Sequence, residues 1–191
     1  MVQLTNLEKD RLLELARGAL EEAVRHGEIS EVMETSEALK TPCGAFVTLE
    51  QGGRLRGCIG QLGTLRPLFL TVRECAVAAA LEDPRFDPVT PAELPSLRLE
   101  ISILSPLMDI VPEQVEVGRH GLLVSRGARR GLLLPQVAVE WNWNREEFLA
   151  ETCLKAGLPA DAWQHGARIQ AFTAQILKEP PAPSPACPTE A

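Results

Sequence analysis

The stretch AFVTLEQGGRLRGCIG, residues 45–60, predicts a β-hairpin and decides the fold class. Residues 45–50 and 54–59 are runs typical of β-strands. Gly52 and Gly53 stand between them, and glycine readily adopts the positive φ angles that a tight hairpin turn requires. Because a hairpin pairs its strands antiparallel, the sheet that contains this segment is expected to be antiparallel.

Helical patterns stand on both sides of the hairpin. Thr5 and Glu8 have the spacing of a capping box, and Gly27 follows the apolar pattern as an expected C-terminal cap. A second helix is expected over residues 67–82. The other expected elements are a short helix from Thr90, a strand over 97–103, a hairpin of 122–125 and 132–134, a helix from Asn144 to Gly157 and a last strand over 169–177. Helices and hairpins are interspersed without strict alternation, which favours an α+β fold with antiparallel sheets flanked by helices.

Composition and charge exclude several classes of protein. The chain has 191 residues, a net charge of −7 and a sequence pI near 5.1. An acidic chain of this kind is not expected to bind nucleic acid or an acidic membrane surface. It shows no signal peptide and no apolar run long enough to span a membrane, so we expect a cytoplasmic protein. Its five cysteines are then expected to be free thiols.

The positive charge is concentrated in two segments. Residues 51–80 carry four arginines and one acid, and residues 118–131 carry four arginines and no acid. Such segments in an acidic protein are compatible with a pocket for a small anionic ligand. Solvated loop faces are the alternative, because surface arginines are common.

The hexapeptide at residues 55–60 carries the best candidate nucleophile. Cys58 lies between Gly57 and Gly60, whose small size is expected to let a ligand approach the sulfur. In a regular strand Arg56 projects to the same face as Cys58, where its charge favours the thiolate. The alternative is that Cys58 is a small buried hydrophobic residue and that packing requires the glycines.

Other candidate residues are spread along the chain. His120, within the second basic segment, is the expected base for Cys58, and Glu140 beside two tryptophans is expected to be a carboxylate in an apolar setting. Asp83 and Arg85 form either a ligand clamp or an internal ion pair that pins a helix end. No metal site is expected, because the Cys and His spacings match no metal motif. The glycines match no nucleotide-binding pattern, and the sequence assigns no cofactor.

The last thirteen residues, 179–191, contain five prolines and little apolar surface. We expect them to form a disordered tail that includes Cys187. The folded domain is therefore expected over residues 1–178.

Five ordered stretches resemble the AMMECR family, called AmmeMemoRadiSam system protein A in bacteria and archaea. They are GAFVTL (44–49), LRGCIG (55–60), EDPRF (82–86), GLLLPQV (131–137) and TCLKAGL (152–158). The resemblance implies two interlocked α+β subdomains, with the hexapeptide near the cleft between them. It also implies a Memo-like protein and a radical SAM protein as partners. Gln136, in a matching stretch, is a candidate substrate-binding residue together with Arg56, Gly57, Gly60 and Arg85. The resemblance supplies no reaction.

Two functional hypotheses follow. In the first, the protein is an enzyme in which Cys58 is a nucleophile or redox thiol, Arg56 holds an anionic substrate group, and His120 or Glu140 moves protons. In the second, the protein is a non-catalytic binding or assembly module that presents the hexapeptide to its partners.

Overall fold

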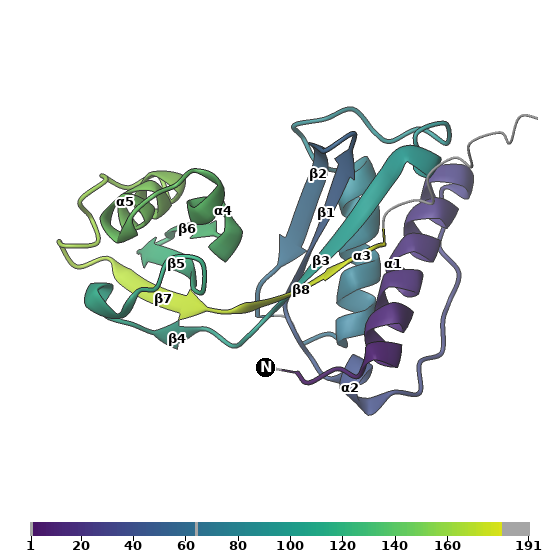
Figure 1. Ribbon diagram of the computed structural model, residues 1–191, viewed down its shortest axis with the longest axis horizontal. Helices are drawn as coiled ribbons and strands as arrows, with labels where there is room; N and C mark the ends of the chain where they lie inside the picture. Colours follow the sequence, from purple (N-terminus) through teal and green to yellow (C-terminus); the bar gives the residue numbers. More distant parts are fainter. Residues whose placement is uncertain (1, 64, 181–191) are drawn as a thin grey trace, which may run out of the picture. The chain divides into compact units, whose positions relative to one another are not determined.

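The computed structural model describes residues 2–63 and 65–180, which form two compact units (Figure 1). The larger unit comprises residues 2–102 and 176–180, and the inserted unit comprises residues 103–175. Both units combine helices with an antiparallel sheet, so the α+β prediction is confirmed.

The larger unit contains a sheet with the strand order β2-β1-β3-β8. Its elements are α1 (Asn6–His26), α2 (Glu37–Lys40), β1 (Ala45–Gln51), β2 (Arg54–Gln61), α3 (Leu68–Leu81), a 3-10 turn (Leu94–Ser96), β3 (Leu97–Leu104) and β8 (Ala174–Lys178). Strands β3 and β8 run across the boundary between the units. The chain thus leaves the larger unit along one strand of its sheet and returns along another.

Helix α1 begins and ends where its local sequence predicts. The Thr5 hydroxyl accepts a hydrogen bond from the Glu8 amide at 3.3 Å, and the Glu8 carboxylate accepts one from the Thr5 amide at 2.8 Å. Gly27 ends the helix with a φ of 78°. The apolar face of α1 is buried, and the helix packs against α3.

The β1–β2 hairpin forms as predicted, with φ angles of 58° at Gly52 and 76° at Gly53. Helix α3 packs on both strands, and the alternate residues Ala45, Val47 and Leu49 are buried on that side. Neighbouring residues of a strand point to opposite faces of the sheet. Residues between these three therefore lie on the face opposite α3.

The hairpin contains an irregularity that affects the candidate site. Leu49 pairs with Gly57, but Glu50 pairs with Leu55, so Arg56 has no partner in the register of β1. An extra residue of this kind is a β-bulge, which bends the strand and redirects a side chain. The regular strand expected through Arg56 and Cys58 is therefore interrupted.

The inserted unit contains a second sheet with the strand order β4-β7-β5-β6. Its elements are β4 (Met108–Asp109), a 3-10 turn (Pro112–Gln114), β5 (Gly121–Arg126), β6 (Arg129–Leu133), α4 (Pro135–Glu140), α5 (Arg145–Lys155) and β7 (Arg168–Phe172). Asn144 and Glu147 form a second capping box at the start of α5. Phe148 and Cys153 of α5 are fully buried in a core with Leu122 of β5.

Two predicted elements differ from the structure. The single strand expected over residues 169–177 is two strands in different sheets, with Thr173 between them accepting a hydrogen bond from the Ser105 amide at 2.8 Å. The helix expected from Thr90 is a turn, in which the Thr90 amide donates to the Glu93 carboxylate at 2.8 Å, followed by the 3-10 turn. A contact with a residue 68 positions away along the chain interrupts the first pattern, and a local side-chain contact interrupts the second.

The disordered tail is expected from residue 179, but Glu179 is bonded to other residues of the larger unit. The Glu179 amide donates to the Leu99 carbonyl at 3.0 Å, and its carboxylate pairs with the Arg17 guanidinium, with Nε 2.8 Å from Oε1. Glu179 therefore belongs to the larger unit. Residues 181–191, including Cys187, lie outside the described residues.

Candidate functional site

The hexapeptide lies on β2, at the end of the strand order in its sheet. Cys58 pairs with Thr48 of β1, so both side chains lie on the face opposite α3. The Thr48 hydroxyl donates a hydrogen bond to the Cys58 Sγ atom at 3.3 Å. The thiol is half-buried.

An ion pair from the turn after α3 covers the outer edge of β2 at Cys58. The Cys58 amide donates to Asp83 Oδ2 at 2.8 Å, and Arg85 Nη2 donates to the Cys58 carbonyl at 3.2 Å. Arg85 also donates to both Asp83 oxygens, from Nε at 2.9 Å and from Nη2 at 2.6 Å. These bonds hold the pKa of the buried Asp83 carboxyl well below its usual range, and the bond from the Arg85 side chain has the largest effect. Of the two alternatives for Asp83 and Arg85, the internal ion pair is present.

The pKa of the Cys58 thiol is raised, chiefly because the group is buried. The hydrogen bond from Thr48 and the positive charge of Arg85 lower it, but they do not overcome the burial. The expectation that Arg56 lowers this pKa is wrong. Arg56 stands in the bulge and binds Glu93 instead.

Arg56 forms a two-point ion pair across the larger unit. Its Nε and Nη2 atoms donate to the Glu93 carboxylate at 2.8 and 3.3 Å. These bonds, followed by one from the Thr90 amide, lower the pKa of Glu93 to about 2. The third nitrogen of the guanidinium, Nη1, is buried and has no hydrogen-bond partner among the described residues. One strong donor of Arg56 is therefore unused.

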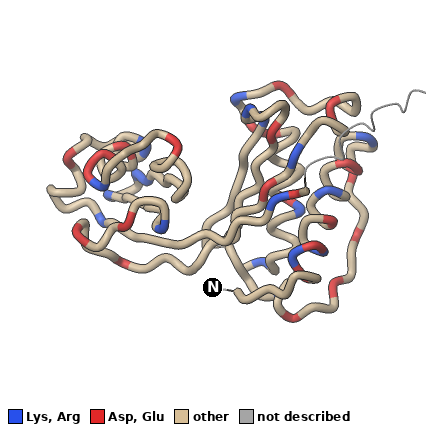
Figure 2. Tube along the Cα trace, in the orientation of Figure 1, with Lys and Arg blue, Asp and Glu red and all other residues tan. Residues whose placement is uncertain are grey.

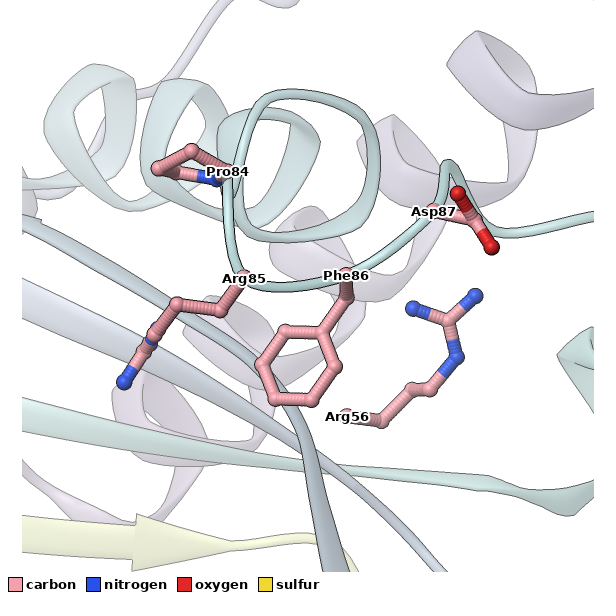
Figure 3. Close-up of a pocket in the computed structure, with 5 residues that line it drawn as sticks. All are labelled: Arg56, Pro84, Arg85, Phe86 and Asp87. Atoms are coloured by element: carbon pink, nitrogen blue, oxygen red, sulfur yellow. The ribbon is translucent and has the colours of Figure 1, made fainter.

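A pocket of about 450 Å³ is lined by Arg56, Pro84, Arg85, Phe86 and Asp87 (Figure 3). In Figure 3 the Phe86 ring lies between the two arginine side chains. The guanidinium carbons lie 6.0 Å (Arg56) and 5.5 Å (Arg85) from the ring centroid, within the range of cation–π attraction. The Asp87 carboxylate lies on the Arg56 side of the ring. The pocket thus offers guanidinium donors, an aromatic face and a carboxylate.

The glycines of the hexapeptide do not open a path to Cys58. A Cβ atom on Gly57 would lie 2.0 Å from the carbonyl oxygen of Ala79 in α3. A Cβ atom on Gly60 would lie 2.2 Å from the ring of Phe46. Close packing on both faces of the sheet therefore requires glycine here, and the expected uncrowded approach to the thiol is wrong.

Three candidate residues lie in the inserted unit, whereas Cys58 lies in the larger unit. His120 Nδ1 accepts a hydrogen bond from the Glu116 amide at 3.1 Å and so takes part in its own turn. Glu140 is exposed at the end of α4, which contradicts the expected apolar setting. Gln136 is half-buried on the same helix. These three residues and the hexapeptide therefore belong to different units.

The two basic segments also lie in different units, and some of their arginines have partners. Figure 2 shows acidic residues beside basic ones in both units. Arg119 pairs with Glu116 at 2.9 Å, and Arg129 donates to the Gly157 carbonyl at 2.8 Å. No group of three or more His, Cys, Asp or Glu side chains in residues 2–63 and 65–180 is placed to hold a metal ion.

Several residues of the site were not predicted from the sequence. Phe86 and Asp87 follow Arg85 directly, and the Asp-Pro-Arg-Phe turn was the available signal for them. Glu93 is 37 residues from Arg56 along the chain, and no local pattern connects the two. Thr48 becomes identifiable only from the register of the hairpin.

Comparison with known families matches residues 13–177 to the AMMECR1 model. The chain belongs to the AMMECR1 family. A relative from Thermococcus gammatolerans is 46% identical over 181 residues, covering 88% of each chain. One from Methanothermobacter thermautotrophicus is 44% identical over 177 residues, covering 88% of this chain and 92% of the relative. The crystal structure of an uncharacterised protein from Pyrococcus horikoshii is similar, with a TM-score of 0.86, 42% identity and coverage of 92% and 93%. Two stretches of the AMMECR1 resemblance, 55–60 and 82–86, are joined through the Asp83–Cys58 hydrogen bond.

Proposed function

We propose that this protein binds a small ligand carrying a carboxylate or phosphate group in the pocket beside the hexapeptide. The observation that carries the proposal is the buried Nη1 atom of Arg56, which has no hydrogen-bond partner among the described residues and belongs to a side chain of the pocket wall. A buried donor without an acceptor costs about 1–3 kcal/mol, and an anionic group that accepts from it removes this cost. A guanidinium suits planar oxyanions particularly well.

Glu93 keeps the guanidinium in place for such a ligand. It binds Nε and Nη2, which leaves Nη1 as the donor without an acceptor. Phe86 lies within 6.0 Å of the guanidinium carbon and limits its movement. A donor that is already oriented loses less conformational entropy when the ligand binds.

Titration of the ¹⁵N-labelled full chain with acetate and with inorganic phosphate tests this function by NMR. We expect the amide signals of Arg85, Phe86 and Asp87 to shift in a saturable way. Arg56→Lys keeps a positive charge beside Glu93 but lacks Nη1, and it should weaken binding about tenfold or more. Arg54→Lys, on the exposed part of the same strand, is the matched control and should bind normally. Absence of saturable shifts, or equal affinity of Arg56→Lys and wild type, would overturn the proposal.

A thiol reaction at Cys58 is a second candidate function. The Thr48 hydroxyl and the Arg85 charge both favour the thiolate, although burial opposes it. Labelling with a limiting amount of iodoacetamide at pH 7, for which the cysteines compete, tests this candidate. A nucleophilic Cys58 reacts before the buried Cys43, Cys75 and Cys153, and acetate or phosphate protects it. Equally slow reaction at all four cysteines would contradict the candidate. His120 and Glu140 enter this candidate as proton carriers only if their variants slow the same reaction.

Association with a Memo-like protein and a radical SAM protein is proposed from the family resemblance. Its structural support is Leu55, a hydrophobic residue of β2 that is 45% exposed beside the hairpin turn. Co-purification of each partner with the full chain should be lost on Leu55→Asp and unchanged by Cys58→Ser. A complex that tolerates Leu55→Asp would exclude this surface.

We also propose a cytoplasmic location. Cys58, Cys75 and Cys153 are free thiols, which persist in a reducing compartment. Among the helices of the described residues, none has both the length and the apolar character needed to cross a membrane. Immunodetection after cell fractionation tests the location.

A further inference from the structure

The charges around the pocket are not balanced. Arg56 is paired with Glu93, and Arg85 is paired with Asp83. Asp87 is exposed in the pocket wall and forms no ion pair within the described part of the chain. The two guanidiniums and three carboxylates therefore leave one negative charge in excess, and that excess is located at Asp87.

A purely anionic ligand is attracted by one group of this pocket and repelled by another. The unused Nη1 donor of Arg56 attracts its oxyanion. The Asp87 carboxylate, on the same side of the Phe86 ring in Figure 3, repels it. At a separation of about 4 Å, such repulsion is several-fold stronger beside a protein than in bulk water. A ligand that also carries a positive group converts this repulsion into attraction.

We propose that the ligand is a small zwitterion of the amino-acid class. Its carboxylate accepts from Arg56 Nη1, and its ammonium group donates to Asp87. The Phe86 ring provides the apolar surface for the carbon chain between them. The pocket volume of about 450 Å³ is adequate for a molecule of this size. This inference rests on the proposed function, because it adds an ammonium site to the carboxylate site.

Matched ligand pairs test the ammonium site separately from the carboxylate site. Acetate and glycine, propionate and β-alanine, and butyrate and γ-aminobutyrate each differ by one amino group. NMR titration of the full chain should show that at least one zwitterion binds about tenfold tighter than its carboxylate partner. Because the three pairs differ in chain length, the preferred pair also reports the spacing between the two binding groups.

The Asp87→Asn variant should lose this preference, so that the zwitterion and its partner bind with equal affinity. Asp10→Asn, at an exposed position on α1, is the control and should keep the preference. Equal binding of both ligands by the wild type, or a preference retained in Asp87→Asn, would overturn the ammonium site and leave the proposed function intact. If the matching amines bind as tightly as the zwitterions, the carboxylate contact is excluded as well. If none of the ligands binds, both proposals fail.

Discussion

The Asp83 carboxylate accepts a hydrogen bond from the backbone amide of Cys58, with Oδ2 2.8 Å from the nitrogen. Arg85 donates to the Cys58 carbonyl at 3.2 Å and binds the same carboxylate. Two side chains thus satisfy the groups that a neighbouring strand would otherwise bind. Because exposed strand edges invite pairing with other chains, this ion pair also protects the outer edge of β2. It connects the hexapeptide to the turn that builds the pocket.

Asp83→Asn should destabilise the larger unit by about 2 kcal/mol, since it weakens charge-assisted bonds to a buried group. Urea unfolding measures the loss, and faster hydrogen exchange at the Cys58 amide locates it. Asp87→Asn, four residues further on and exposed, should change the free energy of unfolding by less than about 0.5 kcal/mol. Equal stability of the two variants would show that the Asp83 contacts do not support the fold.

Two glycine-to-alanine substitutions should have effects of opposite sign. In Gly57→Ala the new Cβ atom would overlap the Ala79 carbonyl, so we expect a loss of about 1–3 kcal/mol or more. Gly18→Ala, within α1 and with nothing within 4 Å of its Cβ position, should gain about 0.5–1 kcal/mol from helix propensity. Thermal and urea unfolding give both values. A Gly57→Ala protein as stable as wild type would refute the packing explanation of the hexapeptide glycines.

Thr48→Val should raise the pKa of Cys58 further, because it removes a hydrogen bond that favours the thiolate. The rate of iodoacetamide modification at Cys58, followed by peptide mass mapping, should then begin to rise at a higher pH than in wild type. Thr48→Ser keeps the hydroxyl and serves as the control. Coincident pH profiles for the Val and Ser variants would show that the hydroxyl does not act on the thiol.

The Arg56–Glu93 pair should contribute to stability in a pH-dependent way. The pKa of Glu93 falls from its ordinary value of 4.5 to about 2 in the folded protein. Its contribution is therefore fully present above the unfolded pKa and is lost as the pH falls through the folded value. The difference in free energy of unfolding between wild type and Glu93→Gln should be constant above pH 4.5 and should shrink toward pH 2.

Urea titrations at a series of pH values measure this difference. Glu28→Gln, at an exposed position, should show no comparable change with pH. A wild-type advantage over Glu93→Gln that persists unchanged at pH 2 would contradict the assignment to this pair.

Local sequence was sufficient for most of the secondary structure. The capping boxes Thr5–Glu8 and Asn144–Glu147 join groups three residues apart, so their patterns mark both helix starts correctly. The Gly52–Gly53 turn likewise determines the β1–β2 hairpin, because its positive φ angles depend on those two residues alone. The division of residues 169–177 into two strands depends on contacts with distant segments, and no local pattern indicates it.

The candidate site required the tertiary structure. The sequence by itself identified Cys58 and Arg56 as candidates two residues apart and Arg85 as a separate candidate, and all three lie in the larger unit. Only the fold decided that a bulge turns Arg56 to Glu93, that burial raises the pKa of Cys58, and that Phe86 lines a pocket together with Arg56 and Arg85. Burial and charge depend on residues that are distant in sequence and meet only after folding. The type of a residue therefore indicates which interactions and reactions it can take part in. Its neighbours in the folded structure decide which of these occur.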